Sequence, residues 1–348
     1  MTSPLDCFAG FQDVYGQEVR LRLKTLTPLY TGGIGQRGDQ LHSSGLLGSI
    51  RAFSGLVARA VGDSGFEARV WGNAGTREQK PSAKGVSLRI DTSGLQRISL
   101  PERPIKIPKQ DRTQKDSSWY FNGSPAMEGT LGLSLLPLGI SDEDWNLLMI
   151  ALRIQARHAS FCAKDQFGMG VVEAEGLPPA TALALDETRR GAGFSLLRCV
   201  FADLELKPSA GARNVTLNRE QRIELGLQIR AHLRAWLRPQ AAGDAELDES
   251  SWRAIRHRLM GALGEWASGV DVSAAFKRED KWFVRLFIRL EFEGETAKIA
   301  REAAFKRIRE ALSAGLDSGW SVMTPTAWQF GGKHLTNPIP WINQLAGL

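Results

Sequence analysis

Hydrophobic and polar residues alternate with a period of two in several short segments of the chain. In the first segment, residues 19–26, Val19, Leu21 and Leu23 alternate with basic residues. Such alternation predicts a strand with one buried face and one face in water. The same pattern predicts strands at residues 86–90, 127–138 and 284–290, and residues 196–206 begin a second set of elements.

Between these strands, apolar residues recur at the spacing of a helix. Leu46, Ile50 and Phe53 begin the first such pattern, and Ser43 or Ser44 can cap it. Comparable patterns predict further helices at residues 141–161, 217–238, 252–266 and 296–314. Helices and strands therefore follow one another along the whole chain.

A glycine-rich loop joins the first strand to the first helix. It reads Thr27-Pro-Leu-Tyr-Thr-Gly-Gly-Ile-Gly-Gln36. Its glycines let the backbone come close to a ligand, and amides exposed at the start of a helix favour an anion such as a phosphate. The loop lacks the Gly-Lys-Ser/Thr of a Walker loop and the glycine spacing of a dinucleotide fingerprint.

At these residues the chain resembles the RAMP superfamily of CRISPR proteins, whose first strand ends in a Thr-Pro-Leu-x-x-Gly-Gly turn. Residues 42–51, His-Ser-Ser-Gly-Leu-Leu-Gly-Ser-Ile-Arg, are similar to the segment that follows in that family. Residues 163–172 are similar to its hallmark glycine loop, with Lys164 and Gln166 where the family usually has arginines. Within the superfamily the chain looks most like the first RAMP subunit of the Cmr, or type III-B, effector complex.

The resemblance implies an α+β fold of two tandem ferredoxin-like (RRM-like) units, with antiparallel sheets, helices on one face and Gly-rich loops. We expect the first unit to span residues 1–178, with a basic insertion near 101–126. The second, more helical unit should span residues 195–348. Its Phe330-Gly-Gly-Lys sequence suggests a second copy of the first unit.

Charge and composition narrow the choice of partner. The net charge of +6 and the isoelectric point of about 9.3 favour an anionic partner. The three cysteines are far apart and odd in number, which argues against a disulfide framework and predicts a reducing, cytoplasmic setting. No apolar run approaches the ~20 residues that cross a bilayer, so we expect no membrane partner.

The resemblance implies that RNA is bound through its phosphates, with glycine amides and nearby basic side chains as the contacts. Arg51 has a structural interpretation as well, since it lies off the apolar stripe of its helix. The residues predicted to contact RNA are Thr31, Gly32, Gly33, Gly35, Arg37, His42, Ser43, Ser44, Arg51, Lys164, Gln166, Gly168, Gly170, Arg230, Arg234 and Lys333.

Two basic features of the sequence can each be interpreted in two ways. Arg230, Arg234 and Arg238 recur every four residues on one helix, either as a phosphate track or as a solvated face opposite the core. Residues 101–126 are rich in proline and basic residues and end in Trp119-Tyr-Phe121. This arm could follow a phosphate backbone and stack a base, or it could be a connecting hairpin whose aromatic residues pack into the domain.

The sequence carries no strong signature of an enzyme. Its five histidines form no metal-binding motif, and neither a metal nor a cofactor is predicted. His42 and Asp39 are the candidates for metal-independent RNA cleavage, because each lies in or beside the loop where RAMP nucleases carry a catalytic residue. The alternative for His42 is a loop histidine that only makes hydrogen bonds.

The function implied by the resemblance is a non-catalytic RNA-binding subunit of a type III CRISPR ribonucleoprotein effector complex. Such a subunit would cap the filament near the 3' end of the guide RNA and help capture target RNA in antiviral defence. Its partners would be CRISPR guide RNA, target RNA or both, and other RAMP subunits. Two alternatives stay open, an endoribonuclease that uses His42 or Asp39 and an assembly subunit that binds no RNA alone.

Overall fold

The structure is a computed structural model of the chain. It describes residues 18–30, 40–73, 75, 81–107, 117–161, 168–184, 195–208, 215–238, 247–261, 268–292, 297–316, 320–323, 328–330 and 337–348.

The first unit is built on an antiparallel sheet with the order β2-β6-β1-β7. Strand β3 pairs with β6 beyond the end of β2, so that the two short strands together flank one long strand. The elements of this unit are β1 (Val19–Thr25), α2 (Ser43–Ala60), α3 (Phe66–Trp71), β2 (Val86–Asp91), β3 (Leu95–Ser99), β4 (Ile105–Ile107), β5 (Ser117–Trp119), β6 (Pro125–Pro137), α4 (Asp142–His158) and β7 (Val172–Glu175).

The second unit repeats this plan with the sheet order β10-β11-β8-β12. Here too one edge strand is interrupted, because β9 and β10 pair in succession with β11. Both units therefore have the strand order of a ferredoxin-like fold, and the prediction of two such units in tandem is confirmed. The elements are the 3-10 turn Leu196–Arg198, β8 (Cys199–Pro208), α5 (Arg219–Trp236), α6 (Glu249–Met260), β9 (Val270–Val272), β10 (Phe276–Arg278), β11 (Lys281–Arg289), α7 (Ala297–Ser313), β12 (Trp320–Met323), β13 (Gln329–Phe330) and α8 (Pro338–Ala346).

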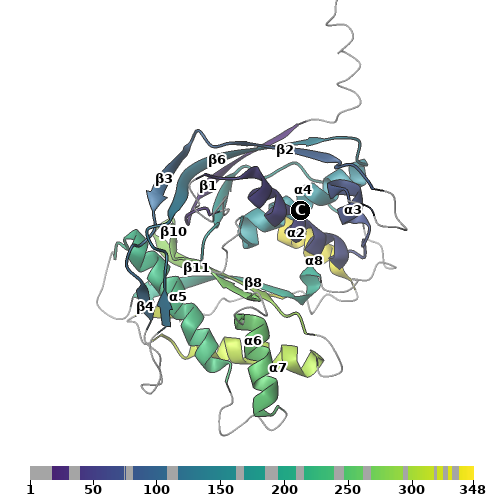
Figure 1. Cartoon of the computed structure of the whole chain (residues 1–348). Helices are drawn as coiled ribbons and strands as arrows, with labels where there is room; N and C mark the ends of the chain where they lie inside the picture. The colour runs from purple at the N-terminus through teal and green to yellow at the C-terminus, as the bar shows by residue number, and fades with distance from the viewer. Residues whose placement is uncertain are drawn as a thin grey trace, which may run out of the picture.

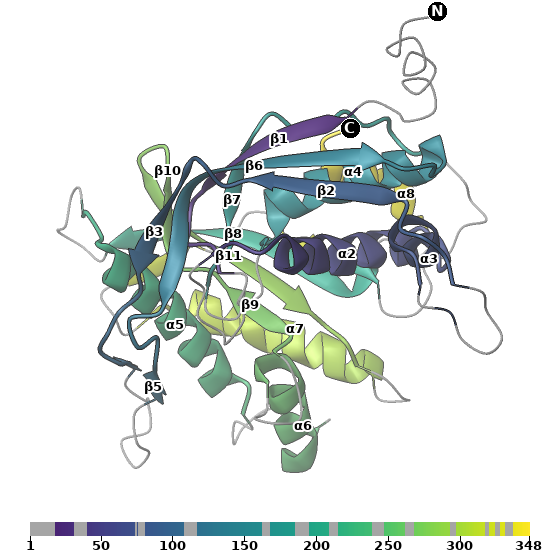
Figure 2. The ribbon, with the colours of Figure 1, turned by 45° about the horizontal axis from the view of Figure 1, so that its top comes forward.

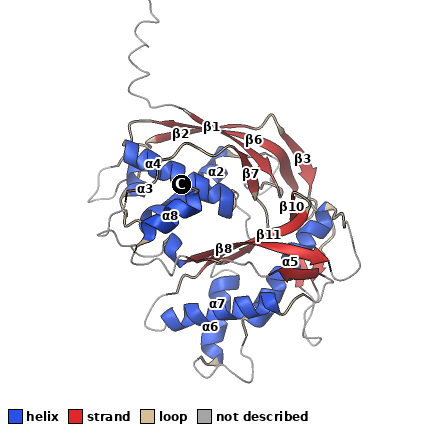
Figure 3. Ribbon diagram, turned by 180° about the vertical axis from the view of Figure 1, so that it is seen from behind, coloured by secondary structure: helices blue, strands red, loops and turns tan. Residues whose placement is uncertain are grey.

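The units stack as four layers, sheet, helices, sheet and helices (Figures 1 and 3). Helices α2 and α4 lie between the two sheets, while α5, α6 and α7 cover the outer face of the second sheet. Phe201 of β8 and Phe287 of β11 stack with ring centroids 5.0 Å apart and belong to the same apolar core as α2 and α4. The second sheet is therefore covered on both faces.

Helix α8 belongs by its packing to the first unit, although the sequence placed residues 195–348 together in the second. Its Ile339, Trp341 and Ile342 are buried in the core that α2 and α4 share with the first sheet. Arg153 of α4 donates to the carbonyl oxygen of Ala346 at 2.8 Å. The chain thus returns at its end to close the core with which it began (Figure 1).

Arginines of the second unit hold the two units together. Arg219 makes two hydrogen bonds to the carboxylate of Glu128 in β6, at 3.1 and 2.9 Å. Arg285 pairs with Asp203 in its own sheet and also donates to the carbonyl oxygen of Ala159 at the end of α4, at 3.0 Å. Because these bonds satisfy polar groups at the junction, the junction can exclude water without leaving charges unpaired.

Candidate nucleic-acid interface

The predicted site centres on the start of α2, directly after the first glycine loop. His42 takes an extended conformation at the N-cap, and Ser43 and Ser44 begin the helix with exposed side chains. The side chain of the N-cap residue His42 makes no capping hydrogen bond to this helix, and its first turn contains no acidic residue. The first amides of the helix and the positive end of its dipole are therefore not offset by a carboxylate of the first turn.

The helices around it begin differently. Ser141 caps α4, a reciprocal capping box caps α5, and Asp248 caps α6. Each of these three helices also carries at least one acidic residue in its first turn. Helix α2 shares with α8 an N-cap residue whose side chain makes no capping bond and a first turn without an acidic residue, and of these two only α2 follows the glycine-rich loop of residues 27–36.

An exposed stripe continues along α2 from this end. Ser44, Gly48 and Arg51 are spaced four and three residues apart, so they lie on one face of the helix, and all three are exposed. A side chain at Gly48 would meet no atom within 4 Å, which shows that this part of the helix is open. Arg51 lies 3.9 Å from Glu67 of α3, a long ion pair that leaves its guanidinium accessible.

The second glycine loop is closed where the structure describes it. Gly168 and Gly170 are buried. The Gly170 amide donates to the carbonyl oxygen of Pro28 at 2.8 Å, and the Gly168 carbonyl accepts the Ala274 amide at 2.9 Å. The prediction that these two glycines contact RNA was therefore wrong, because both serve the packing of the loop against β1 and the second unit.

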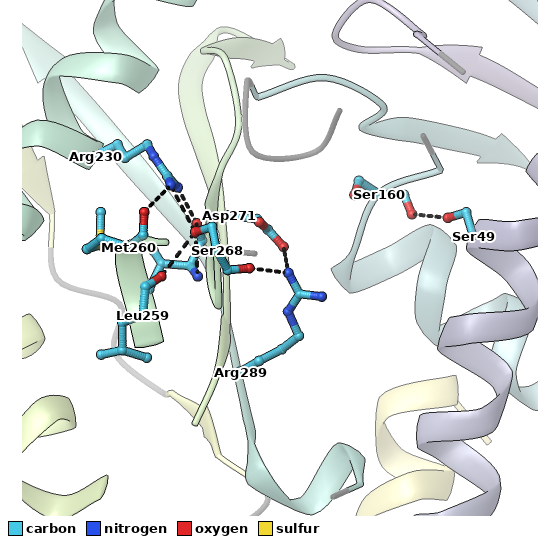
Figure 4. A network of polar contacts seen from close by, with 9 residues as sticks. Ser49, Ser160, Arg230, Leu259, Met260, Ser268, Asp271 and Arg289 are labelled. Atoms are coloured by element: carbon cyan, nitrogen blue, oxygen red, sulfur yellow. Dashed lines mark hydrogen bonds and ion pairs between the residues drawn. The ribbon is translucent and has the colours of Figure 1, made fainter. Parts of the chain in front are cut away.

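The sequence also predicted an RNA contact at Arg230, but the structure buries this residue. Its side chain is only 5% exposed, and its guanidinium donates to the carbonyl oxygens of Val270 and Met260 and to Ser268 Oγ (Figure 4). Because α5 is covered on one side by its own sheet and on another by the β4–β5 hairpin, the face that carries Arg230 is not solvated. The same row of arginines does place Arg234 on the surface.

The basic arm near residues 101–126 includes this hairpin, which Figure 2 shows beside α5. Phe121 is buried, and the guanidinium of Arg230 lies 5.9 Å from the ring centroid of Trp119. These aromatic residues pack into the protein, as the structural interpretation of the arm predicted. Tyr120 differs, with 66% of its surface exposed.

The remaining predicted residues lie outside the described part of the chain. They are Thr31, Gly32, Gly33, Gly35, Arg37, Asp39, Lys164, Gln166 and Lys333. Of the predicted RNA contacts, the structure thus brings together His42, Ser43, Ser44 and Arg51 on α2 and places Arg234 on the other unit.

The chain was compared with known proteins. No family model matches the sequence, and no curated protein matches it. The fold is similar to the crystal structure of Cmr1 from Pyrococcus furiosus in its apo form, with 11% identity and a TM-score of 0.43 over 88% of this chain and 98% of that one.

The residues that the structure describes contain no cluster of three or more histidine, cysteine or acidic side chains that could hold a metal ion, and no helix long and apolar enough to cross a membrane. His158 is half-buried between α8 and the second sheet, where desolvation and the charge of Arg285 lower its pKa to about 4. Its contacts with Leu345 and Phe201 serve the packing of α8 against the second sheet.

Proposed function

We propose that this chain is a non-catalytic RNA-binding subunit of a type III CRISPR ribonucleoprotein, of the kind that caps the filament near the 3' end of the guide RNA and helps capture target RNA in antiviral defence. Guide RNA, target RNA and other RAMP subunits would be its partners. The observation that carries the proposal is the open N-terminus of α2, which directly follows the glycine loop of the family resemblance.

Phosphates of the RNA would be held by the first amides of α2 and by the hydroxyl groups of Ser43 and Ser44. Arg51, about two turns further along the same face, would contact a neighbouring phosphate. These contacts recognise the backbone and not the bases, so binding should tolerate changes of sequence and weaken steeply with salt. The tandem ferredoxin-like fold and the basic charge of the chain support the same proposal.

A double variant, Ser43→Glu with Ser44→Glu, tests the role of α2. It gives this helix an acidic first turn like those of α4, α5 and α6, so the helix itself should fold normally. The new carboxylates would occupy the amides and repel phosphate. We expect the affinity for a labelled single-stranded RNA, measured by fluorescence anisotropy, to fall at least tenfold. The slope of log affinity against log salt should become less steep by about 0.7 for each phosphate that the variant no longer binds.

The matched control is Ser99→Glu with Ser321→Glu, which adds the same charge at exposed strand positions of the two units. This control should bind RNA nearly as well as the natural chain. Equal losses in both double variants would contradict a site at α2 and indicate only a general effect of charge. A natural chain that binds no RNA at low salt would favour a purely assembly role.

A further inference from the structure

A cavity beside the start of β1 contains none of the predicted RNA contacts. It has a volume of about 540 Å³, within the ~300–1,000 Å³ range of ligand-binding pockets. Its lining comes from β1, the end of β6, the end of β7 with the segment that follows, and the start of α4. All of these elements belong to the first unit, so the cavity does not depend on how the two units meet.

The sheet has no strand on one side of β1 at this cavity. Residues 19–21 pair with β6 on the other side, whereas the pairing of β1 with β7 begins only at Arg22. Beyond β7 the chain turns at Gly176, whose φ is +83°, and Arg153 of α4 then donates to the carbonyl oxygen of Pro178 at 2.9 Å. Within the part of the chain that the structure describes, this stretch of β1 is therefore an open strand edge. Such an edge can pair with a further extended segment.

Helix α4 supplies an aromatic ring and a carboxylate to the lining. Asp142 and Trp145 are three residues apart at its start and therefore lie on one face of the helix. Asp142 is exposed, and Trp145 is half-buried. Ile140 and Leu177 add apolar surface to the cavity. A ligand can therefore meet an aromatic ring, apolar side chains and a carboxylate together.

The charge of the lining is acidic. Glu18, Asp142 and Glu175 contribute carboxylates, and among the described lining residues Arg20 is the one cation. Arg20 is already paired with Glu18 at 2.6 Å, and Arg22 lies 3.3 Å from Glu175. No residue that the structure describes makes a hydrogen bond or an ion pair with Asp142. The cavity therefore favours a cation over an anion such as phosphate.

We propose that this cavity binds an extended segment of a partner protein that presents an arginine side chain. The segment would pair with the open edge of β1 at residues 19–21, and its arginine would lie against Trp145 with the guanidinium donating to Asp142. Guanidinium groups stack on aromatic rings and bind carboxylates through two parallel hydrogen bonds, so arginine fits this lining better than lysine. The inference goes beyond the proposed function and does not depend on RNA binding.

The test measures the binding of a fluorescently labelled peptide, acetyl-Val-Thr-Arg-Thr-Val-amide, by anisotropy. Its β-branched residues favour an extended backbone. Asp142→Lys should weaken binding at least tenfold, because repulsion replaces a charge-assisted hydrogen bond.

Glu143→Lys is the matched control. It makes the same change of charge in the same helical turn, and Glu143 is exposed but does not line the cavity. This variant should weaken binding by less than about twofold, since an exposed charge outside the site contributes little. The melting temperatures of the two variants report that both are folded.

Two altered peptides test the side chain and the backbone of the segment separately. Citrulline in place of the arginine keeps the shape and removes the charge, so this peptide should bind the natural chain at least tenfold more weakly. Methylation of two successive backbone amides removes the donor that faces β1, because successive amides of a strand point to opposite edges. The methylated peptide should also bind at least tenfold more weakly.

Three results would each overturn the inference. The first is a natural chain that does not bind the arginine peptide at concentrations up to about 1 mM. The second is an equal loss of binding in Asp142→Lys and Glu143→Lys, which would show only a general attraction between an acidic helix start and a cation. The third is a citrulline peptide or a methylated peptide that binds as well as the arginine peptide.

Discussion

Gly168, in the loop before β7, lies against Ala274, in the interruption between β9 and β10. The Ala274 amide donates to the Gly168 carbonyl oxygen at 2.9 Å, and a methyl group on Gly168 would lie 2.3 Å from the Ala274 nitrogen. Gly168 also has a φ of +80°, in the left-handed region that favours glycine. The glycine loop of the first unit therefore acts as a contact between the two units.

Gly168→Ala should destabilise the protein by about 2 to 4 kcal/mol, from the left-handed backbone and from the collision with Ala274. Gly176→Ala is the matched control, since its φ is +83° but a methyl group there would meet nothing within 4 Å. The control should be destabilised by only about 1 to 2 kcal/mol through backbone strain. Urea denaturation measures both effects. Equal destabilisation of the two variants would show that the contact with Ala274 adds nothing.

A second pair of glycines should respond with opposite signs. A methyl group on Gly226 of α5 would lie 2.4 Å from the carbonyl oxygen of Ser273, whereas one on Gly48 of α2 would meet nothing within 4 Å. Alanine favours a helix over glycine by about 1 kcal/mol, so Gly48→Ala should stabilise the protein by up to that amount. Gly226→Ala should instead destabilise it by about 1 to 2 kcal/mol, because α5 must move away from the second sheet. Thermal unfolding of the two variants gives the sign, and two shifts in the same direction would contradict this account.

These glycine and arginine positions show which features of the structure follow from neighbours in the sequence and which depend on distant residues. The alternation in β1 and the helical spacing in α2 and α4 depend on neighbours in the chain, and they predicted these elements correctly, whereas the tandem fold was implied by the family resemblance. The environments of Gly168 and Arg230 are set by residues that lie far away in the sequence, more than a hundred residues away for Gly168 and about forty for Arg230. The sequence carries no periodic signal of such packing. The position at which α2 starts was predictable because a helix start is local, but its cap was not: Ser43 or Ser44 was expected to cap the helix, whereas the N-cap is His42 and its side chain makes no capping bond.

We expect Arg230 and Arg234 of α5 to have different roles, Arg230 in stability and Arg234 in RNA binding. Arg230→Ala removes three hydrogen bonds inside the protein and leaves their acceptors buried. It should destabilise the protein by about 3 kcal/mol. Arg234→Ala, on the exposed face, should change stability by less than about 0.5 kcal/mol while weakening RNA binding. Melting temperature and RNA affinity of both variants test this, and the prediction fails if Arg230→Ala melts like the natural chain.

His158 should make the stability of the protein depend on pH. Its Nε2 lies 3.2 Å from the carbonyl oxygen of Leu345 in α8, and burial is the first cause that lowers its pKa to about 4. Between pH 6.5 and 4 the unfolded chain binds a proton that the folded chain excludes, so this contribution to stability is complete above pH 6.5 and is lost as the pH falls towards 4. The full effect is up to about 3 kcal/mol, since one pKa unit corresponds to about 1.4 kcal/mol. His158→Gln keeps an amide that can donate to Leu345 but does not titrate, so its free energy of unfolding, measured in urea at pH 7, 5.5 and 4.5, should fall less than that of the natural chain. If the two proteins lose stability in parallel over this range, His158 is not the group responsible.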